Sequence, residues 1–514
     1  MRNAEFTVWR WIIKKIIRAM LMLTIFSVLT RCLGFIYKIY LTKIMTTTEL
    51  GIYNLSISIY MVLITLVGAS IPLTISKITA SNIKNKNTDD TKYSVTSSLI
   101  LTTVFSVFLA LLILISKPLI TLIIGDSIGY LIIVSLIPSI IFTAIYSQIR
   151  GYLWGLENYF AVSIVEFVEQ ILRIGFCIIF AMTGVFSSPI IAVCVALSIA
   201  CGLSTFYGLI LYIKNNGKFK YKKGYFKGII KSTLPLTGVR LFGSLLQPLI
   251  AIIIPFMLCN LGMSKDLALS ELGIVMGMTM PLLSIPSTLI GAMCMILIPR
   301  LNSVSNNFEL KRQINNYLKF TLTCIFMFIP IFLILSTPLC TYVYSNIDAG
   351  FYMTKCSWII IPLGLSQLTT SILNALNQEN RTFVYYIFSC IIMIALTFIL
   401  PKFIGIQTML VATGTSSIIL FALNLQQLRK MFGVKTNIFK SIIYHALVCI
   451  PVIILTNFCY NIFSNTLGAF MTLIFTGIVS VLGYFGLLFV FGILDVNILK
   501  DYIIAHFKNK QKVK

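Results

Sequence analysis

The sequence predicts an all-α polytopic membrane protein with about fourteen transmembrane helices, arranged as two pseudo-symmetric six-helix lobes plus a C-terminal helix pair. The composition is the first observation that predicts this class: of 514 residues, 58% are hydrophobic and only 11% are charged, and the mean hydropathy is +0.96. The second is that the apolar residues fall in runs long enough for membrane helices, each of which needs about 20 residues. The third is a repeat at a nearly constant offset.

Polar stretches and Pro or Gly residues divide the apolar runs. In chain order the predicted spans are 19–43, 50–78, 94–116, 128–150, 159–182, 189–213, 229–259, 271–299, 315–337, 356–377, 382–401, 404–428, 438–460 and 468–493. Prolines inside the spans, among them Pro72, Pro138 and Pro330, predict either helix breaks at which lobes rock or plain packing kinks.

The distribution of basic residues tests the count of spans. The chain carries 40 Lys and Arg against 15 Asp and Glu, a net charge of +25. Most of these cations lie in the N-terminal tail, in the loops after even-numbered spans and in the C-terminal tail. The opposite loops carry only Lys43, Lys117, Lys265, Lys355 and Lys402. By the positive-inside rule, both termini are predicted to be cytoplasmic, so the charge requires no nucleic-acid partner.

Four short sequence matches define the repeat. They are Glu49-Leu50-Gly51-Ile52 with Glu271-Leu272-Gly273-Ile274, Glu157-Asn158 with Glu379-Asn380, Ser116-Lys117-Pro118-Leu119 with Ser336-Thr337-Pro338-Leu339, and Arg31, Gly34 and Lys38 with Arg240, Gly243 and Gln247. An offset of six spans keeps both copies in one orientation. The predicted parts are an interfacial N-terminus 1–18, a first lobe 19–213, a basic cytoplasmic linker 214–228, a second lobe 229–428, an extra helix pair 429–493 and a basic cytoplasmic tail 494–514.

Charged residues inside spans are the candidate binding groups, because a charge at mid-bilayer costs at least about 2.5 to 3.5 kcal/mol unless it faces a cavity or a partner. Arg31, Gly34 and Lys38 fall on one helix face. Arg240, Gly243 and Gln247 repeat that pattern, which predicts two cationic walls of one cavity. Guanidinium groups suit phosphate oxygens. The alternative is that each Arg snorkels or binds backbone carbonyls.

The span 159–182 carries three further charges, Glu166, Glu169 and Arg173. Glu169 and Arg173 are four residues apart, so one carboxylate is expected to pair with Arg173. The other carboxylate is then a candidate proton or cation coupling site. The alternative is a structural ion pair within the first lobe.

The sequence shows few patterns typical of a catalytic or cofactor-binding site. The twelve cysteines fall almost all in apolar runs without metal-ligand spacing, and no phosphate-binding loop is present. His445 and His506 lack a partner histidine or glutamate at metal-site spacing. We therefore expect neither an enzyme nor a metal or cofactor site, with a coupling cation or proton of unidentified nature left open.

Five stretches resemble one family. They are Thr30-Arg31-Cys32-Leu33-Gly34-Phe35-Ile36-Tyr37-Lys38, Glu49-Leu50-Gly51-Ile52-Tyr53, Ile71-Pro72-Leu73-Thr74-Ile75-Ser76-Lys77, Arg150-Gly151-Tyr152-Leu153-Trp154-Gly155 and Glu169-Gln170-Ile171-Leu172-Arg173. The chain resembles the multidrug/oligosaccharidyl-lipid/polysaccharide exporter superfamily, and within it the stage V sporulation protein B-like group, akin to MurJ-type lipid II flippases. It departs from the group at Trp154 and Glu166, where the resemblance leads one to expect glutamine.

The resemblance implies alternating access and movement of a polyprenyl-diphosphate-linked saccharide, in particular an undecaprenyl-linked one such as lipid II, with the spore cortex as a setting. It assigns the cavity cations to Arg31 and Arg240. Anionic membrane lipids and cell-wall synthesis enzymes are the other expected partners. Two alternatives stay open: a cation-coupled multidrug antiporter of the same superfamily, and a membrane scaffold for envelope synthesis that transports nothing.

Overall fold

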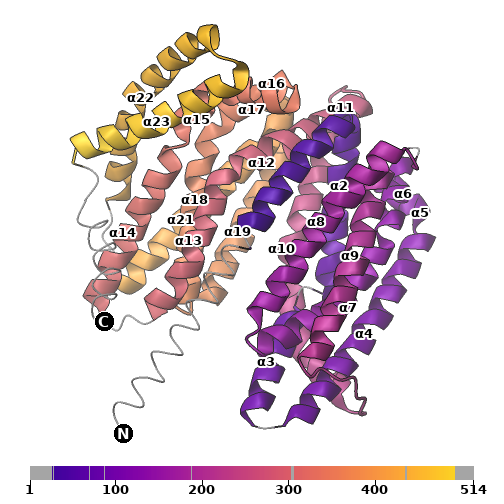
Figure 1. Cartoon of the computed structure of the whole chain (residues 1–514). Helices are drawn as coiled ribbons and strands as arrows, with labels where there is room; N and C mark the ends of the chain where they lie inside the picture. The colour runs from indigo at the N-terminus through magenta and orange to yellow at the C-terminus, as the bar shows by residue number, and fades with distance from the viewer. Residues whose placement is uncertain are drawn as a thin grey trace. The chain divides into compact units, whose positions relative to one another are not determined.

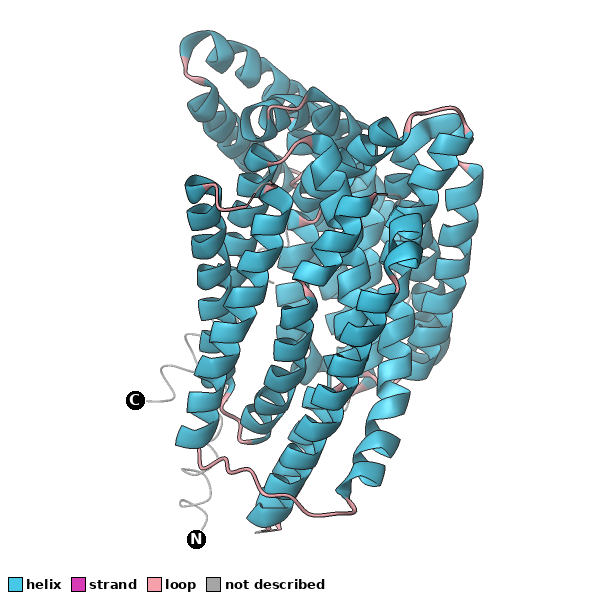
Figure 2. Ribbon diagram, turned by 90° about the vertical axis from the view of Figure 1, so that its right-hand side faces the viewer, coloured by secondary structure: helices cyan, strands magenta, loops and turns pink. Residues whose placement is uncertain are grey.

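The computed structural model describes residues 26, 28–68, 70–85, 87–124, 126–186, 188–302, 306–433 and 437–492. Within these residues the chain consists of helices joined by short turns and loops, without a strand (Figure 2). The all-α prediction is therefore confirmed. The predicted N-terminal segment 1–18 and the C-terminal tail 494–514 lie outside the described residues.

The described part of the chain contains 12 helices that are long and apolar enough to cross a membrane. They correspond in order to twelve of the fourteen predicted spans. A thirteenth predicted span, 159–182, is the helix α8 (Tyr159–Thr183), whose three charged residues set it apart from the twelve. The remaining predicted span, 19–43, is the first in the chain and begins outside the described residues. A helix at 28–44 covers its second half. The chain is thus a multi-pass membrane protein.

The chain forms two compact units, the first comprising Met1–Met278 with Thr397–Ile406. After the helix at 28–44, its helices are α2 (Thr47–Gly68), α3 (Ile71–Lys84), α4 (Thr88–Ile115), α5 (Lys117–Ile124), α6 (Ser127–Ser135), α7 (Ile137–Gly155), α8, α9 (Pro189–Lys214), α10 (Tyr225–Asn260), α11 (Lys265–Gly273) and α20 (Pro401–Ile404) (Figure 1). A π-helical turn, η1 (Ile274–Thr279), follows α11.

The second unit comprises Thr279–Leu396 and Gln407–Lys514. Its helices are α12 (Met280–Leu283), α13 (Ile285–Asn302), α14 (Asn307–Phe326), α15 (Ile329–Ile334), α16 (Ser336–Tyr344), α17 (Ile347–Cys356), α18 (Ile360–Ala375), most of α19 (Glu379–Ile399), α21 (Thr408–Phe432), α22 (Ile438–Thr466) and α23 (Ala469–Val490). Two 3₁₀ turns, η2 (Ser357–Ile359) and η3 (Gly405–Gln407), lie before α18 and α21.

Prolines divide several spans into two helices, as the sequence allows. Pro72 lies in the first turn of α3, Pro138 in that of α7 and Pro330 in that of α15. A proline is tolerated there because the first turn of a helix leaves its N–H groups without intrahelical acceptors. Pro248 and Pro255, by contrast, lie inside the uninterrupted helix α10.

The two copies of the repeated Glu-Leu-Gly-Ile motif pack against each other within the first unit. A Cβ atom added to Gly51 of α2 would lie 1.9 Å from the Leu269 carbonyl oxygen, and one added to Gly273 would lie 2.0 Å from that of Thr47. The Ser270 hydroxyl donates a hydrogen bond to the Thr47 hydroxyl oxygen over 2.7 Å. Helices α2 and α11 therefore meet backbone to backbone at glycines that the repeat equates.

These contacts place α10 and α11 in the first compact unit, where α10 also packs against α2 and α4. The sequence-based lobes, 19–213 and 229–428, follow the repeat instead, and that division remains a prediction. The predicted basic linker 214–228 begins at the last residue of α9 and ends within the first turn of α10.

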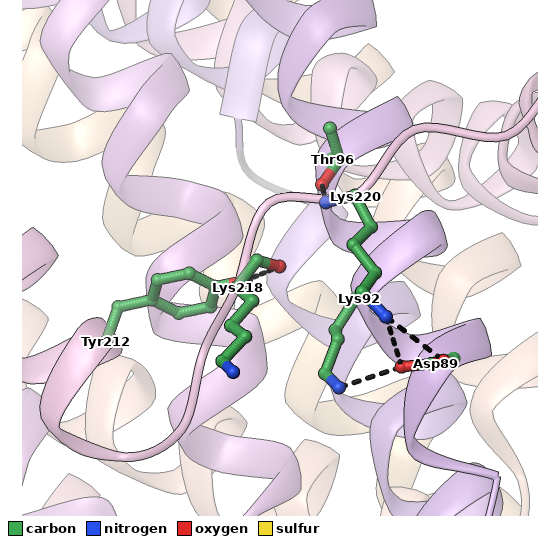
Figure 3. Close-up of polar contacts among 6 residues, drawn as sticks. All are labelled: Asp89, Lys92, Thr96, Tyr212, Lys218 and Lys220. Atoms are coloured by element: carbon green, nitrogen blue, oxygen red, sulfur yellow. Dashed lines mark hydrogen bonds and ion pairs between the residues drawn. The ribbon is translucent and has the colours of Figure 1, made fainter.

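The linker is attached to the start of α4 by specific contacts (Figure 3). The backbone N–H of Lys220 donates to the Thr96 hydroxyl over 3.0 Å, and its ammonium group forms an ion pair with Asp89 at 3.2 Å. The Tyr212 hydroxyl donates to the Lys218 carbonyl oxygen over 3.1 Å. The loop thus has a defined course over the end of the first unit.

The C-terminal helices α22 and α23 pack together and against α14 and α15 in the second unit. His445 of α22 is buried, stacks on Phe326 of α14 and lies 3.1 Å from the Tyr484 hydroxyl of α23. A buried polar pair of this kind satisfies both groups and fixes the register of the helices. His445 therefore has a structural setting.

Candidate functional site

The helix at 28–44 carries the first candidate cations. Arg31 and Lys38 are exposed, and neither has a hydrogen bond or ion pair among the described residues. Gly34 faces α8, because a Cβ added there would lie 3.7 Å from the Gln170 side-chain nitrogen. Tyr37 is buried beside the same helix. The glycine therefore marks the face that packs on α8, and the two cations remain available to other groups.

Arg173 of α8 is directed toward this first helix. Its guanidinium carbon lies 5.4 Å from the centre of the Tyr37 ring, and it donates a hydrogen bond to the Gln170 side-chain oxygen. Among the described ion pairs none joins Arg173 to Glu166 or Glu169, so the expected pairing on α8 is not formed. The cation–π contact and the amide oxygen stabilise the guanidinium instead.

The two carboxylates of α8 are held by neighbouring helices. Glu169 accepts a hydrogen bond from the Ser204 hydroxyl of α9 over 3.2 Å, and the Cys201 thiol lies 3.8 Å away. Glu166 forms an ion pair with Arg150 of α7, with 2.9 Å between Oε1 and Nη2. Both residues are partly exposed. The interhelical contacts explain why the i, i+4 spacing on α8 did not decide the pairing.

Arg150 is a candidate binding residue that reasoning from the sequence missed. Its guanidinium carbon lies 4.5 Å from the centre of the Trp154 ring, one turn further along α7. Its Nε atom is buried without a hydrogen-bond partner. The two residues at which the chain departs from the group it resembles, Trp154 and Glu166, therefore both contact Arg150. The four-residue spacing of Arg150 and Trp154 is the sequence signal that could have revealed part of this cluster.

Two glycines of α7, each next to one of these two residues in the chain, pack closely against α3. A Cβ added to Gly151 would lie 2.9 Å from Pro72 of α3, and one added to Gly155 would lie 2.4 Å from the Cβ of Thr79. Such distances are far below van der Waals contact, so only glycine permits this approach of α3 and α7. The position of Arg150 is thereby set by rigid helix packing.

Arg240 of α10 belongs to the same region of the first unit. It is exposed and lies close enough to Arg150 for the two positive charges to repel each other. Gly243 is partly exposed and Gln247 is exposed on the same helix. The structure therefore pairs Glu166 with Arg150 and places the charge of Arg240 within their electrostatic reach. The assignment of the cations Arg31, Lys38 and Arg240 to substrate binding, and of Gly34, Gly243 and Gln247 to the cavity face, stays a prediction.

The described residues contain no group of three or more His, Cys, Asp or Glu side chains placed to hold a metal ion. All twelve cysteines are free thiols, and most of them are buried. Buried thiols of this kind act as small apolar side chains.

The comparisons with known proteins agree with this architecture. A model of the polysaccharide biosynthesis protein family matches residues 16–305, more than half of the chain. The chain belongs to this family. Stage V sporulation protein B of Bacillus subtilis (strain 168) is a relative, 21% identical over 457 residues that cover 84% of this chain and 87% of that protein.

Solved structures of two transport proteins share the fold. Lipid II flippase MurJ in its inward closed conformation aligns with a TM-score of 0.72 and 16% identity over 90% of this chain and 97% of that one. A multidrug resistance MATE family transporter in its inward-facing conformation aligns with a TM-score of 0.64 and 13% identity over 79% of this chain and 94% of that one. Together with the family match, they confirm the predicted exporter superfamily and its MurJ-like group. By their names these structures are a flippase and a transporter rather than enzymes.

Proposed function

We propose that this protein is a flippase that moves an undecaprenyl-diphosphate-linked saccharide across the bacterial cytoplasmic membrane by alternating access. The leading substrate is the peptidoglycan precursor lipid II, and the spore cortex is the proposed setting. The observation that carries the proposal is the set of guanidinium groups on membrane helices of the first unit, Arg31, Arg150 and Arg240. Their cost within a membrane is offset when they face an anionic ligand.

The chemistry of the substrate explains why these groups are arginines. A diphosphate presents several negatively charged oxygens, which guanidinium binds through paired N–H donors without losing its charge at any physiological pH. Lys38 adds a further cation on the helix of Arg31. The names of the relatives point the same way: one is a sporulation protein and one is a lipid II flippase.

Glu169 is the proposed coupling carboxylate of this transport cycle. It lies on α8 between Glu166, which binds Arg150, and Gln170, which binds Arg173. Its closest partner is the Ser204 hydroxyl. Glu166 is already in an ion pair, so Glu169 is the better candidate for a proton or cation. Anionic membrane lipids are the proposed partners of the basic linker, and cell-wall synthesis enzymes are the proposed suppliers and users of the substrate.

A multidrug antiporter is the main alternative, because transporters of that kind share the fold. A pump for cationic drugs should present carboxylates to its substrate, whereas the repeated positions of this chain hold Arg31 and Arg240. A membrane scaffold without transport is the third possibility, and it should tolerate the loss of both arginines.

The proposal is tested by flipping of a fluorescent lipid II analogue in proteoliposomes, with wild-type protein beside the Arg31→Ala/Arg240→Ala double variant. Each charged hydrogen-bonding group contributes about 1.5 to 3 kcal/mol, so we expect a loss of transport of at least about tenfold. Arg381→Ala serves as the matched control, because this arginine donates to Gln427 within the second unit.

Thermal unfolding in detergent would verify that each variant is folded. Full flipping by the folded double variant would exclude the cationic binding site. Wild-type protein that moves a cationic dye but no polyprenyl-diphosphate glycan would replace the flippase with the antiporter.

A further inference from the structure

We propose that Arg150 and Arg240 form a diphosphate-binding site, and that the carboxylate of Glu166 occupies this site when no substrate is bound. The inference rests on the proposed function and adds a binding residue, Arg150, and a role for Glu166 as a built-in competitor of the substrate. The three residues lie on α7, α10 and α8 of the first unit.

The guanidinium group of Arg150 is incompletely paired. A guanidinium group has five N–H donors, and the ion pair with Glu166 joins its Nη2 atom to Oε1 over 2.9 Å. The Nε atom is buried without a partner. An anion with several oxygens at this position would satisfy more donors than one tethered carboxylate does.

Arg240 adds a second positive charge within electrostatic reach of Arg150. Two guanidinium groups that repel each other in a membrane-embedded unit raise the affinity of the site for an anion near both. The carboxylate of Glu166 contacts Arg150 and brings one negative charge to it. A diphosphate brings more charge and can bind both cations, so it can displace Glu166.

Arg150 is held in place by its own helix. Its guanidinium carbon lies 4.5 Å from the centre of the Trp154 ring, and Gly151 holds the same turn of α7 against α3. The Trp154 contact does not depend on Glu166, so it is expected to persist when Glu166 leaves. A preorganised cation of this kind binds an incoming phosphate without a large entropic cost.

The place of the cluster along the helices suits loading from the cytoplasmic leaflet. Arg150 lies five residues before the end of α7, and Glu166 lies seven residues after the start of α8, so both are within about 8 to 11 Å of the helix ends that the turn joins. The predicted topology puts this turn on the cytoplasmic side. A diphosphate headgroup entering from that side would meet Arg150 early.

The proposal predicts opposite effects of two substitutions on the affinity for inorganic diphosphate. Arg150→Ala removes a ligand, so we expect binding to weaken about tenfold. Glu166→Gln keeps the shape of the side chain but removes the competing charge, so we expect binding to tighten severalfold. Calorimetric titration of the detergent-purified full chain measures both, with Arg381→Ala as the control that leaves affinity unchanged.

A purely structural ion pair makes a different prediction: both substitutions would lower the unfolding temperature and neither would change diphosphate affinity, which would overturn the proposal. Arg150→Lys is the second variant if Arg150→Ala does not fold, since it keeps the charge and loses the planar fork; unchanged affinity in it would also count against the site. Phosphatidylglycerol vesicles that compete as well as diphosphate would show a site for lipid monophosphates instead.

Failure of this inference is distinguishable from failure of the proposed function. Diphosphate binding that responds to both variants, in a protein that flips no lipid-linked saccharide, would support the site and contradict the flippase. Normal flipping by wild-type protein, with diphosphate affinity unaffected in both variants, would keep the flippase and remove the site.

Discussion

The three charged side chains of α8 take three different partners although they share one helix. Glu166 reaches α7, Glu169 reaches α9, and Arg173 lies over a tyrosine of the first helix. A charged side chain in a membrane helix is costly unless it contacts a polar partner, which can come from any neighbouring helix. Local spacing alone therefore identifies which residues need partners, and packing selects the partners.

At this scale we expect Glu169→Gln to abolish stimulation of transport by an imposed proton or cation gradient. Glutamine can still accept the Ser204 hydrogen bond, but it carries no charge and cannot bind and release a proton as a carboxylate does. Flipping in proteoliposomes with and without the gradient measures the effect, and transport without a gradient should stay within about twofold of wild type.

Glu309→Gln is the matched control for this experiment, because Glu309 is an exposed carboxylate in the first turn of α14. Gradient stimulation that survives in Glu169→Gln would assign coupling to another group.

At the scale of elements, glycines decide how closely helices approach. α2 begins with a capping box, in which the Thr46 N–H donates to the Glu49 carboxylate over 2.9 Å and the Glu49 N–H donates to the Thr46 hydroxyl over 3.2 Å. The next turn carries Gly51, which meets α11. The repeated motif therefore combines a helix start with a close helix crossing in its first copy.

We expect Gly51→Ala and Gly273→Ala each to destabilise the folded protein. The added methyl group would overlap a backbone carbonyl, and overpacking of this kind costs about 1 to 3 kcal/mol. Thermal unfolding in detergent should therefore show a lower midpoint for both variants.

Gly175→Ala provides the control of opposite sign. No atom lies within 4 Å of a Cβ added to Gly175 in α8, and alanine is favoured over glycine in a helix. This variant should be as stable as wild type or slightly more stable. Equal midpoints for Gly51→Ala and Gly175→Ala would contradict the close contact of α2 and α11.

At the scale of the whole molecule, the basic residues predict the topology. An epitope at either terminus should resist external protease in intact spheroplasts, whereas an epitope inserted after Leu467, between α22 and α23, should be cleaved. The physical reason is the preference of Lys-rich and Arg-rich segments for the cytoplasmic side. Cleavage of both terminal epitopes in intact spheroplasts would invert the predicted topology.

The sequence by itself determined the fold class, the order of the spans and the family resemblance. Long apolar runs form α-helices in a membrane, because a helix satisfies its backbone hydrogen bonds internally. Those properties depend on residues close together in the chain, so reading along the chain finds them. The prolines at 72, 138 and 330 belong to the same class of local information.

The tertiary structure alone decided which residues form the cluster at Arg150. Sixteen positions separate Arg150 from Glu166, and Arg240 lies much further along the chain, so no periodicity relates them. The close packing at Gly151 and Gly155, the turn between α7 and α8 and the position of α10 bring these charges together. Electrostatic contacts act through space, and the residues that complete a site are therefore fixed by how helices pack.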